Sequence, residues 1–194
     1  TVDAFSSIHE NINSLRSEYE IEAEFNYSFT KSGTQGHDYD PIVASAANAC
    51  TLHYGKNKDQ LPENGLVLLD VGARVGGYAA DITRTYAVGT PTQRQVAVHA
   101  AVQKAHFSII DLLTPGLSVR EYHDRVDEIM KEALRSLDLL HSEDDYRKYF
   151  PHAISHGLGV DVHDSLGKPD ALQPGMILTV EPGIYIPEEG IGVR

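Results

Sequence analysis

The chain has 194 residues, of which 41% are hydrophobic and 23% are charged. These values are typical of a folded globular domain and exclude collagen-like, disordered and coiled-coil sequences. Acidic residues outnumber basic residues by 28 to 16, which gives a formal net charge of −12. A chain this acidic binds nucleic acid and anionic membrane surfaces poorly, so we expect neither as a partner.

Cysteine content and hydropathy indicate the compartment. Cys50 is the single cysteine, so no internal disulfide can form, which is usual in a reducing compartment. No apolar stretch approaches the ~20 residues that a membrane-spanning helix needs, and the first residues lack the apolar segment of a signal peptide. We therefore expect a cytoplasmic protein. Since the sequence does not begin with Met, we also expect a piece of a longer gene product.

The first half of the chain is predicted to hold one helix and three strands. Apolar residues three and four positions apart predict a helix over 2–16. The stretch that follows, up to about Ala49, is rich in Gly, Ser, Asn and aromatic residues and carries only a short predicted strand at 42–44. Apolar runs at 66–70 and 78–88 flank a Gly-rich turn and predict an antiparallel hairpin.

The second half is predicted to hold two helices and one strand. A capping box from Thr90 to Gln93 predicts a helix that ends near residue 113, and a box at 118–121 predicts a helix to about 137. Residues 151–164 are irregular and rich in histidine, and 176–181 form an apolar strand between two Pro-Gly pairs. The mixed order of elements indicates the α+β class and a single domain over 1–194.

Two carboxylates lie at the predicted hairpin. Asp70 ends the first strand and Asp81 comes early in the second, so the turn between them can bring both onto one face. Neighbouring carboxylates repel each other, and a divalent cation removes that repulsion. The alternatives are that each accepts backbone N–H bonds in the turn, or that Asp81 pairs with nearby Arg84.

Three histidines, His152, His156 and His163, lie within twelve residues. Imidazole is the commonest metal ligand and the usual acid–base group near neutral pH, although a single histidine is more often a hydrogen-bonded structural residue. Glu181 adds a third carboxylate at the end of an apolar run, where it could also be a salt-bridged strand end. The sequence has no His-Glu-x-x-His zinc motif, no phosphate-binding glycine loop and no Gly-x-Ser-x-Gly nucleophile motif.

Three motifs in the right order resemble the pita-bread metallopeptidases, in the branch of aminopeptidase P and prolidase. They are Leu-Leu-Asp-Val-Gly with Gly-Tyr-Ala-Ala-Asp-Ile-Thr-Arg-Thr, His-Gly-Leu-Gly-Val-Asp-Val-His-Asp, and Pro-Gly-Met-Ile-Leu-Thr-Val-Glu-Pro-Gly-Ile-Tyr. The resemblance extends from about residue 25 to 194. It implies a curved antiparallel sheet flanked by helices and built from two pseudo-symmetric halves.

The resemblance also implies a site for two divalent ions, namely manganese, cobalt or zinc. Four of the family's five metal ligands correspond to Asp70, Asp81, His156 and Glu181, with Asp81 between the two ions. The fifth, a glutamate, is expected two residues beyond the last residue of the chain. We therefore expect a catalytic domain trimmed at both ends, without the family's N-terminal domain, that binds metal weakly and has little activity.

Further residues match substrate positions of the family. His53, His152, His163 and Arg194 correspond to substrate-binding positions, and His53, His163 and Glu181 to catalytic ones. Glu181 would carry a proton, while His53 and His163 would either stabilise the tetrahedral intermediate or hold the peptide.

The activity implied is that of an Xaa-Pro metallopeptidase, which cleaves the bond before a proline in the second position of a peptide. Whether it is an aminopeptidase or a dipeptidase stays open. The alternatives are a non-catalytic binding module of the same fold and a methionine aminopeptidase. Members of the family are often homodimers, so a dimer is one state to consider.

Overall fold

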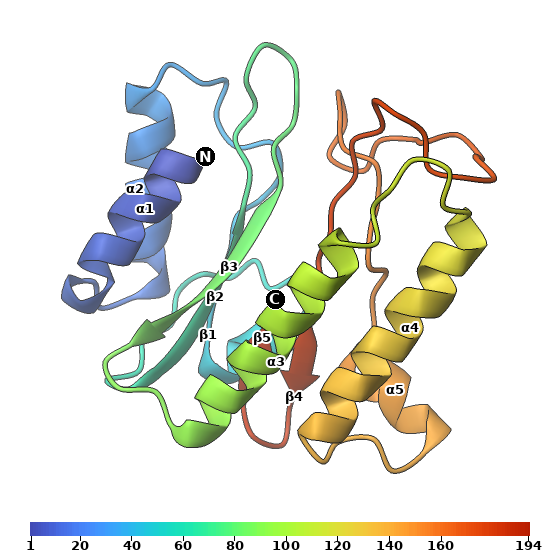
Figure 1. Cartoon of the computed structure of the whole chain (residues 1–194). Coiled ribbons are helices and arrows are strands. Elements are labelled where there is room, and N and C mark those ends of the chain that lie inside the picture. Colours follow the sequence, from blue (N-terminus) through green and yellow to red (C-terminus); the bar gives the residue numbers. More distant parts are fainter.

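A three-stranded antiparallel sheet lies at the centre of the molecule (Figure 1). The computed structural model describes all residues, 1–194. The strands are β1 (Ile42–Ser45), β2 (Gly65–Val71) and β3 (Ile82–Val88), and β2 pairs with both of the others. The predicted hairpin is confirmed, although β3 begins at residue 82 because 78–81 still belong to the turn.

Two N-terminal helices cover one face of this sheet (Figure 1). They are α1 (Val2–Asn11), which is followed by the short 3₁₀ helix η1 (Ile12–Ser14), and α2 (Glu18–Lys31). The first agrees with the predicted helix, which ends in 3₁₀ geometry. The second is not predicted by the sequence analysis, which finds only a short strand in the stretch up to about Ala49, rich in Gly, Ser, Asn and aromatic residues. Its buried residues Ile21, Phe25 and Phe29 recur every four positions, and they pack on the apolar face of β2.

Three further helices lie on the other side of the sheet: α3 (Gln93–Ile110), α4 (Val119–Ser136) and α5 (Glu143–Tyr149). Both long helices were predicted, and Ser118 caps α4 as expected by accepting a hydrogen bond from the backbone N–H of Glu121. The cap of α3 is Thr92, two residues after the predicted Thr90, and it forms a capping box with Gln95. The short helix α5 was not predicted.

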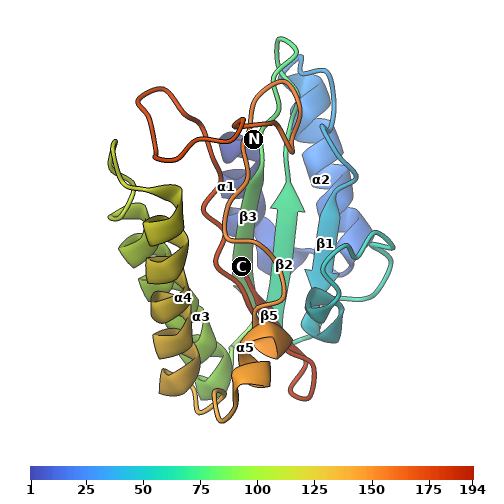
Figure 2. The ribbon, with the colours of Figure 1, turned by 90° about the vertical axis from the view of Figure 1, so that its right-hand side faces the viewer.

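The C-terminal part of the chain runs across the sheet and ends in the hairpin of β4 (Ile184–Ile186) and β5 (Ile191–Val193) (Figure 2). The prediction of a strand at 176–181 was wrong, since this segment belongs to neither sheet. It is extended and hydrogen-bonds to the histidine-rich segment instead, with the N–H of Thr179 donating to His156 O and that of Glu181 to Ile154 O.

The arrangement confirms the α+β class. None of the helices combines the length and the apolar character required to span a bilayer. The 3₁₀ helix η2 (Ala46–Cys50) follows β1 and packs against β5. The central sheet, the histidine-rich segment and the β4–β5 hairpin thereby meet at one place, where the candidate site lies.

Candidate metal centre

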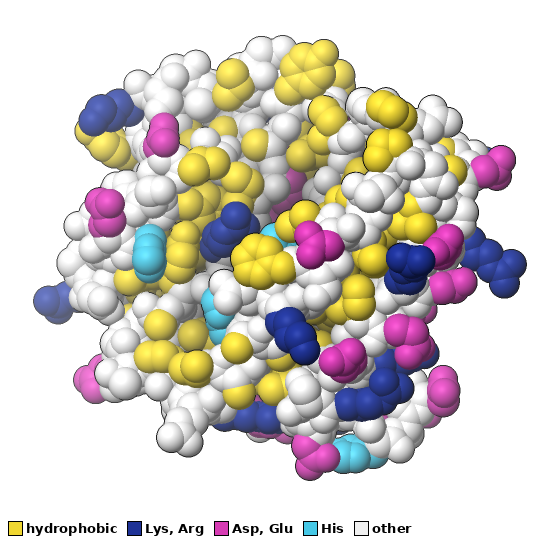
Figure 3. Space-filling view, in the orientation of Figure 1, with side chains coloured by type: hydrophobic (Ala, Val, Ile, Leu, Met, Phe, Trp, Pro, Cys, Tyr) yellow, Lys and Arg dark blue, Asp and Glu magenta, His cyan; other side chains and the backbone are white.

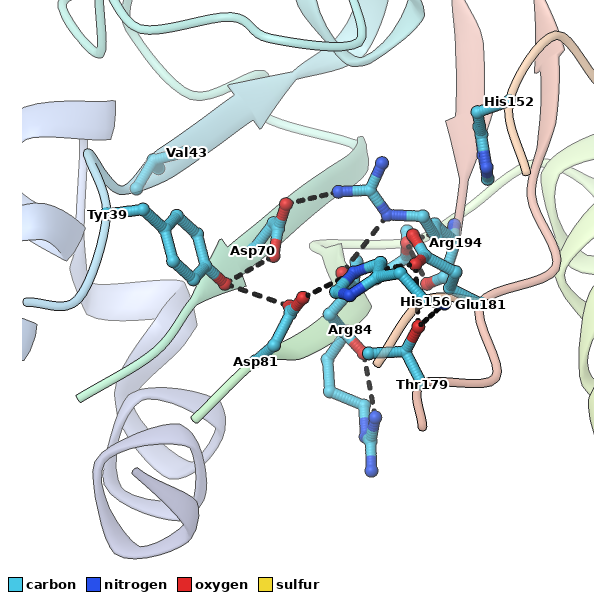
Figure 4. Close-up of polar contacts among 12 residues, drawn as sticks. Tyr39, Val43, Asp70, Asp81, Arg84, His152, His156, Thr179, Glu181 and Arg194 are labelled. Carbon is cyan, nitrogen blue, oxygen red and sulfur yellow. Dashed lines mark hydrogen bonds and ion pairs between the residues drawn. The ribbon is translucent and has the colours of Figure 1, made fainter. Parts of the chain in front are cut away.

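Asp70 and Asp81 are brought together by the β2–β3 hairpin (Figure 4). Leu69 and Val71 belong to the face of the sheet that α1 and α2 cover. Side chains alternate along a strand, so Asp70 points to the opposite face. The hydroxyl of Tyr39 lies 2.7 Å from Asp70 Oδ1 and 3.1 Å from Asp81 Oδ1. A phenol has one proton to donate, so Tyr39 joins the two carboxylates without neutralising either.

His156 lies between Asp81 and Glu181. Its Nε2 is 3.2 Å from Asp81 Oδ2 and 3.2 Å from Glu181 Oε1. Its Nδ1 lies 2.9 Å from the carbonyl oxygen of Gly157, which can only accept, so Nδ1 carries the proton of this hydrogen bond. In the neutral imidazole Nε2 is then a bare acceptor that faces two carboxylate oxygens, and three acceptors of this kind require a proton or a cation among them.

Two carboxyl groups of the cluster have raised pKa values. Burial raises the pKa of Asp81, and the negative charge of Asp70 raises it further. Burial likewise raises the pKa of Glu181. Arg194 is the buried cation of the cluster; its guanidinium forms an ion pair with Asp70, donates from Nε to Thr83 Oγ1 at 3.1 Å and lies 3.3 Å from the Tyr185 hydroxyl. Three carboxylates therefore face one arginine.

The donor set fits divalent cations by its chemistry. Carboxylate oxygens with one imidazole nitrogen suit Mn²⁺, Co²⁺ and Zn²⁺. No three of the His, Cys, Asp and Glu side chains surround a common point in the way that the ligands of one ion do. The four candidate side chains, Asp70, Asp81, His156 and Glu181, instead bond to one another, to Tyr39 and to Arg194. The fit thus rests on the kind and charge of the donors.

The other predicted histidines lie on two sides of this cluster. His152 is half-buried, and its Nε2 is 2.8 Å from the Tyr185 hydroxyl. Burial lowers the pKa of His152 to about 4. His163 is exposed, and its ring stands perpendicular to that of His156 with 4.5 Å between centroids. His53 is exposed in the turn after η2.

The cluster opens onto a groove of about 960 Å³. Asp81, Glu181 and Arg194 line the groove together with residues of β3, of α3 and of the 178–182 segment. The space-filling view shows this hollow at the centre of the molecule, with acidic and histidine side chains set back inside it (Figure 3). A polar cluster in a half-apolar groove is typical of an active site that binds an extended ligand.

Comparison with known proteins identifies the family. The profile described as metallopeptidase family M24 matches residues 1–194. The chain belongs to metallopeptidase family M24. An Xaa-Pro aminopeptidase of Haemophilus influenzae is 41% identical to this M24 chain and covers 92% of it, while the chain covers 46% of that relative. The Xaa-Pro aminopeptidase of Escherichia coli K12 is 39% identical, with coverages of 91% and 45%.

Solved structures show the same relationship. Zn-substituted aminopeptidase P from E. coli, in complex with product, superposes with a TM-score of 0.87 at 35% identity. The matched region covers 98% of the M24 chain and 48% of the E. coli chain. Proline aminopeptidase P II from Yersinia pestis gives a TM-score of 0.86 at 38% identity, with coverages of 98% and 49%. The likeness confirms the pita-bread α+β fold. The chain spans about half the length of the curated relatives it matches.

Sequence reasoning missed two tyrosines of the M24 site. Tyr39 stands between two aspartates in the stretch rich in Gly, Ser, Asn and aromatic residues, and no pattern indicates that its hydroxyl reaches the hairpin carboxylates. Tyr185 closes the third family motif, but its bonds to His152 and Arg194 become visible only in three dimensions. The suggested pair of Asp81 with Arg84 does not form, since Arg84 is exposed and donates to the carbonyl oxygen of Thr83.

Proposed function

We propose that the protein to which this chain belongs is a metal-dependent exopeptidase that hydrolyses the bond before a proline in the second position of a peptide. The observation that carries the proposal is Nε2 of His156 facing the carboxylates of Asp81 and Glu181, 3.2 Å away on each side. The names of the relatives, Xaa-Pro aminopeptidases of two bacteria, support the substrate class.

Asp70, Asp81, His156 and Glu181 would hold two divalent ions, of manganese, cobalt or zinc. Divalent cations at such a site supply a nucleophilic water near neutral pH and polarise the scissile carbonyl. Arg194 and Tyr39 hold Asp70, and Thr179 holds Glu181 through a hydrogen bond of 2.9 Å to Oε1. These contacts fix the carboxylates before a substrate arrives.

Glu181 is the residue that we assign to proton transfer. Its contacts with His156 and Thr179 both engage Oε1, so Oε2 is the oxygen that remains to take up a proton. Glu181 also lines the groove, which places its carboxylate at the position that a bound peptide would reach. From there it would pass the proton to the proline nitrogen, which leaves as a secondary amine.

The histidines beside the cluster would recognise the peptide. An Xaa-Pro bond lacks the N–H through which most peptides are held, so the site needs donors for the carbonyl oxygens instead. We assign this role to His53 and His163, which are exposed, and to His152, which is held by Tyr185. They would bind the substrate carbonyl groups or stabilise the oxyanion of the tetrahedral intermediate.

The test is hydrolysis of matched peptides by the full-length protein to which this chain belongs, after it has been loaded with Mn²⁺, Co²⁺ or Zn²⁺, with chelated protein as the blank. An Xaa-Pro-Yaa peptide should be cleaved and an Xaa-Ala-Yaa peptide should not, as measured by mass spectrometry. His156→Ala should lower cleavage at least ~100-fold and reduce the metal retained after dialysis, because an imidazole ligand is lost. His123→Ala, at an exposed position on α4, is the matched control and should retain both.

Two outcomes would favour other functions. Preference for a peptide with an N-terminal methionine and no proline would indicate a methionine aminopeptidase. Peptide binding without cleavage in every metal would indicate a non-catalytic binding module and would contradict the proposal.

A further inference from the structure

Glu18 is a buried carboxylate outside the candidate metal centre. It is the first residue of α2, it has no exposed surface, and it forms no ion pair with a lysine, arginine or histidine. A buried carboxylate is tolerated only where hydrogen bonds replace the water that it has lost. Here five of them do so. The donors are Ser45 N, Ser45 Oγ and Asn48 Nδ2 to Oε1, and Tyr54 Oη and Asp59 N to Oε2, all at 2.8–3.0 Å.

All five donors belong to one segment, residues 45–59, which connects β1 to the approach of β2. The start of α2 holds the far end of this segment through the backbone as well. The N–H of Glu18 donates to Asp59 O at 2.9 Å, and the N–H of Leu61 donates to Arg16 O at 2.8 Å. Glu18 therefore contacts the segment at its beginning, near its middle and at its end.

The segment needs such support because its backbone is strained. Ala46 has a φ of 47° and Asn57 a φ of 45°, which are left-handed values that residues with a side chain rarely adopt. The two residues flank the turn that carries His53. Strained residues of this kind persist only where the surrounding contacts impose them, and they cluster at functional sites.

His53 depends on this segment for its position. The residues on either side of it, Leu52 and Tyr54, pack in the same apolar cluster as Tyr185, whose hydroxyl bonds to His152. His53 itself stays exposed. Its charge is also one of the influences on His152, whose pKa is lowered mainly by burial and further by Arg194 and His53. The turn thus presents His53 beside the buried wall of the site.

We propose that Glu18 is a positioning residue, whose carboxylate fixes the segment 45–59 and thereby holds His53 at the substrate side of the site. The proposal rests on the function proposed above, since it takes His53 to be a group that contacts the peptide. Glutamine cannot replace Glu18, because its amide nitrogen is a donor that would face other donors.

The first experiment needs no catalysis. Hydrogen–deuterium exchange of Glu18→Gln should show the amides of Ser45 and Asp59 exchanging at least ~10-fold faster than in the wild type, with the central strand β2 unchanged. The Hε1 NMR signal of His53, assigned by its loss in His53→Ala, should shift or broaden. Phe25→Leu, a core variant of the same helix, is the control for general destabilisation and should not single out this segment.

Unchanged exchange at Ser45 and Asp59 in Glu18→Gln would overturn the proposal, as would the same changes in Phe25→Leu. Should Glu18→Gln fail to fold, Tyr54→Phe removes only one of the five hydrogen bonds. It should show the same effects at smaller size, and a wild-type pattern in that variant would equally overturn the proposal.

The second experiment is kinetic and uses the full-length protein to which this chain belongs. Glu18→Gln should lower kcat/KM for an Xaa-Pro peptide about 10-fold in the wild-type background and less than ~2-fold in a His53→Ala background, because a residue that acts through His53 has nothing left to position. Equal losses in both backgrounds would overturn the positioning role. A full-length wild-type protein that hydrolyses no Xaa-Pro peptide would contradict the proposed function alone, since the exchange and NMR measurements still decide whether Glu18 holds the segment and its histidine.

Discussion

His152 should make the stability of the chain depend on pH in a specific window. Its ring is enclosed by Phe150 and Tyr185, with ring centroids 5.0 and 5.5 Å away, and its Nδ1 lies 2.8 Å from the carbonyl oxygen of Ala153. Burial lowers its pKa in the folded chain to about 4, from 6.5 in an unperturbed histidine. The folded state therefore favours the neutral ring, and the unfolded state takes up a proton first.

The size of the effect follows from the two pKa values. Above pH 6.5 the ring is neutral in both states, and His152 adds no pH dependence. As the pH falls from 6.5 towards 4, only the unfolded state binds the proton, so the free energy of unfolding decreases. The full decrease is about 3 kcal/mol, because one pKa unit corresponds to about 1.4 kcal/mol, and about 2 kcal/mol of it falls between pH 7 and pH 5.

The assay is urea unfolding of the chain and of His152→Gln at pH 7 and pH 5, in a chelating buffer. The loss of stability between the two pH values should be about 2 kcal/mol larger in the wild type than in the variant, since contributions of the carboxylates cancel in the comparison. His123→Gln replaces an exposed histidine and should behave as the wild type does. The same loss in wild type and His152→Gln would refute the reasoning.

Three further predictions concern stability, and urea unfolding measures each. Arg74→Met should lower the free energy of unfolding by about 3 kcal/mol, because it leaves the buried carboxylate of Asp38, 2.6 Å away, without its cation; an unchanged midpoint would contradict this. Gly72→Ala should prevent the site hairpin from closing, since an added Cβ would lie 1.5 Å from a backbone oxygen, whereas Gly55→Ala meets nothing and should be tolerated. Ser118→Ala should lower stability by about 1 kcal/mol through loss of the α4 cap.

The elements that could be predicted from the sequence are those whose signal is local. The β2–β3 hairpin and helices α3 and α4 have apolar periodicity, turn glycines or capping residues within their own span. Helix α2 was missed although Ile21, Phe25 and Phe29 recur every four residues, because the aromatic and polar residues that follow it dominated the interpretation of the whole stretch. The extended segment 176–181 has a strand-like composition, yet its hydrogen-bond partner is the irregular segment around His156.

The site was predictable in its residue types and not in its contacts. The carboxylates and His156 stand in motifs that identify them, so their convergence was expected. Arg194 and Tyr39 could not be placed in the same way, because each reaches Asp70 across a large separation in sequence, 124 and 31 positions. Neither distance has a periodic signature, and only the packing of the β4–β5 hairpin and of the 35–39 segment on the sheet creates these contacts.

The contacts of Arg194 and Tyr39 with Asp70 explain how three carboxylates can lie close together in the fold. Asp70 receives both of them, the charged guanidinium on Oδ2 and the Tyr39 hydroxyl on Oδ1. Asp81 and Glu181 receive no arginine or lysine and share the imidazole of His156. The charge of Asp70 is therefore compensated by a direct ion pair, whereas burial raises the pKa of Asp81 and of Glu181, which have no such partner. The demand for a cation is greatest at Asp81 and Glu181, which also line the groove.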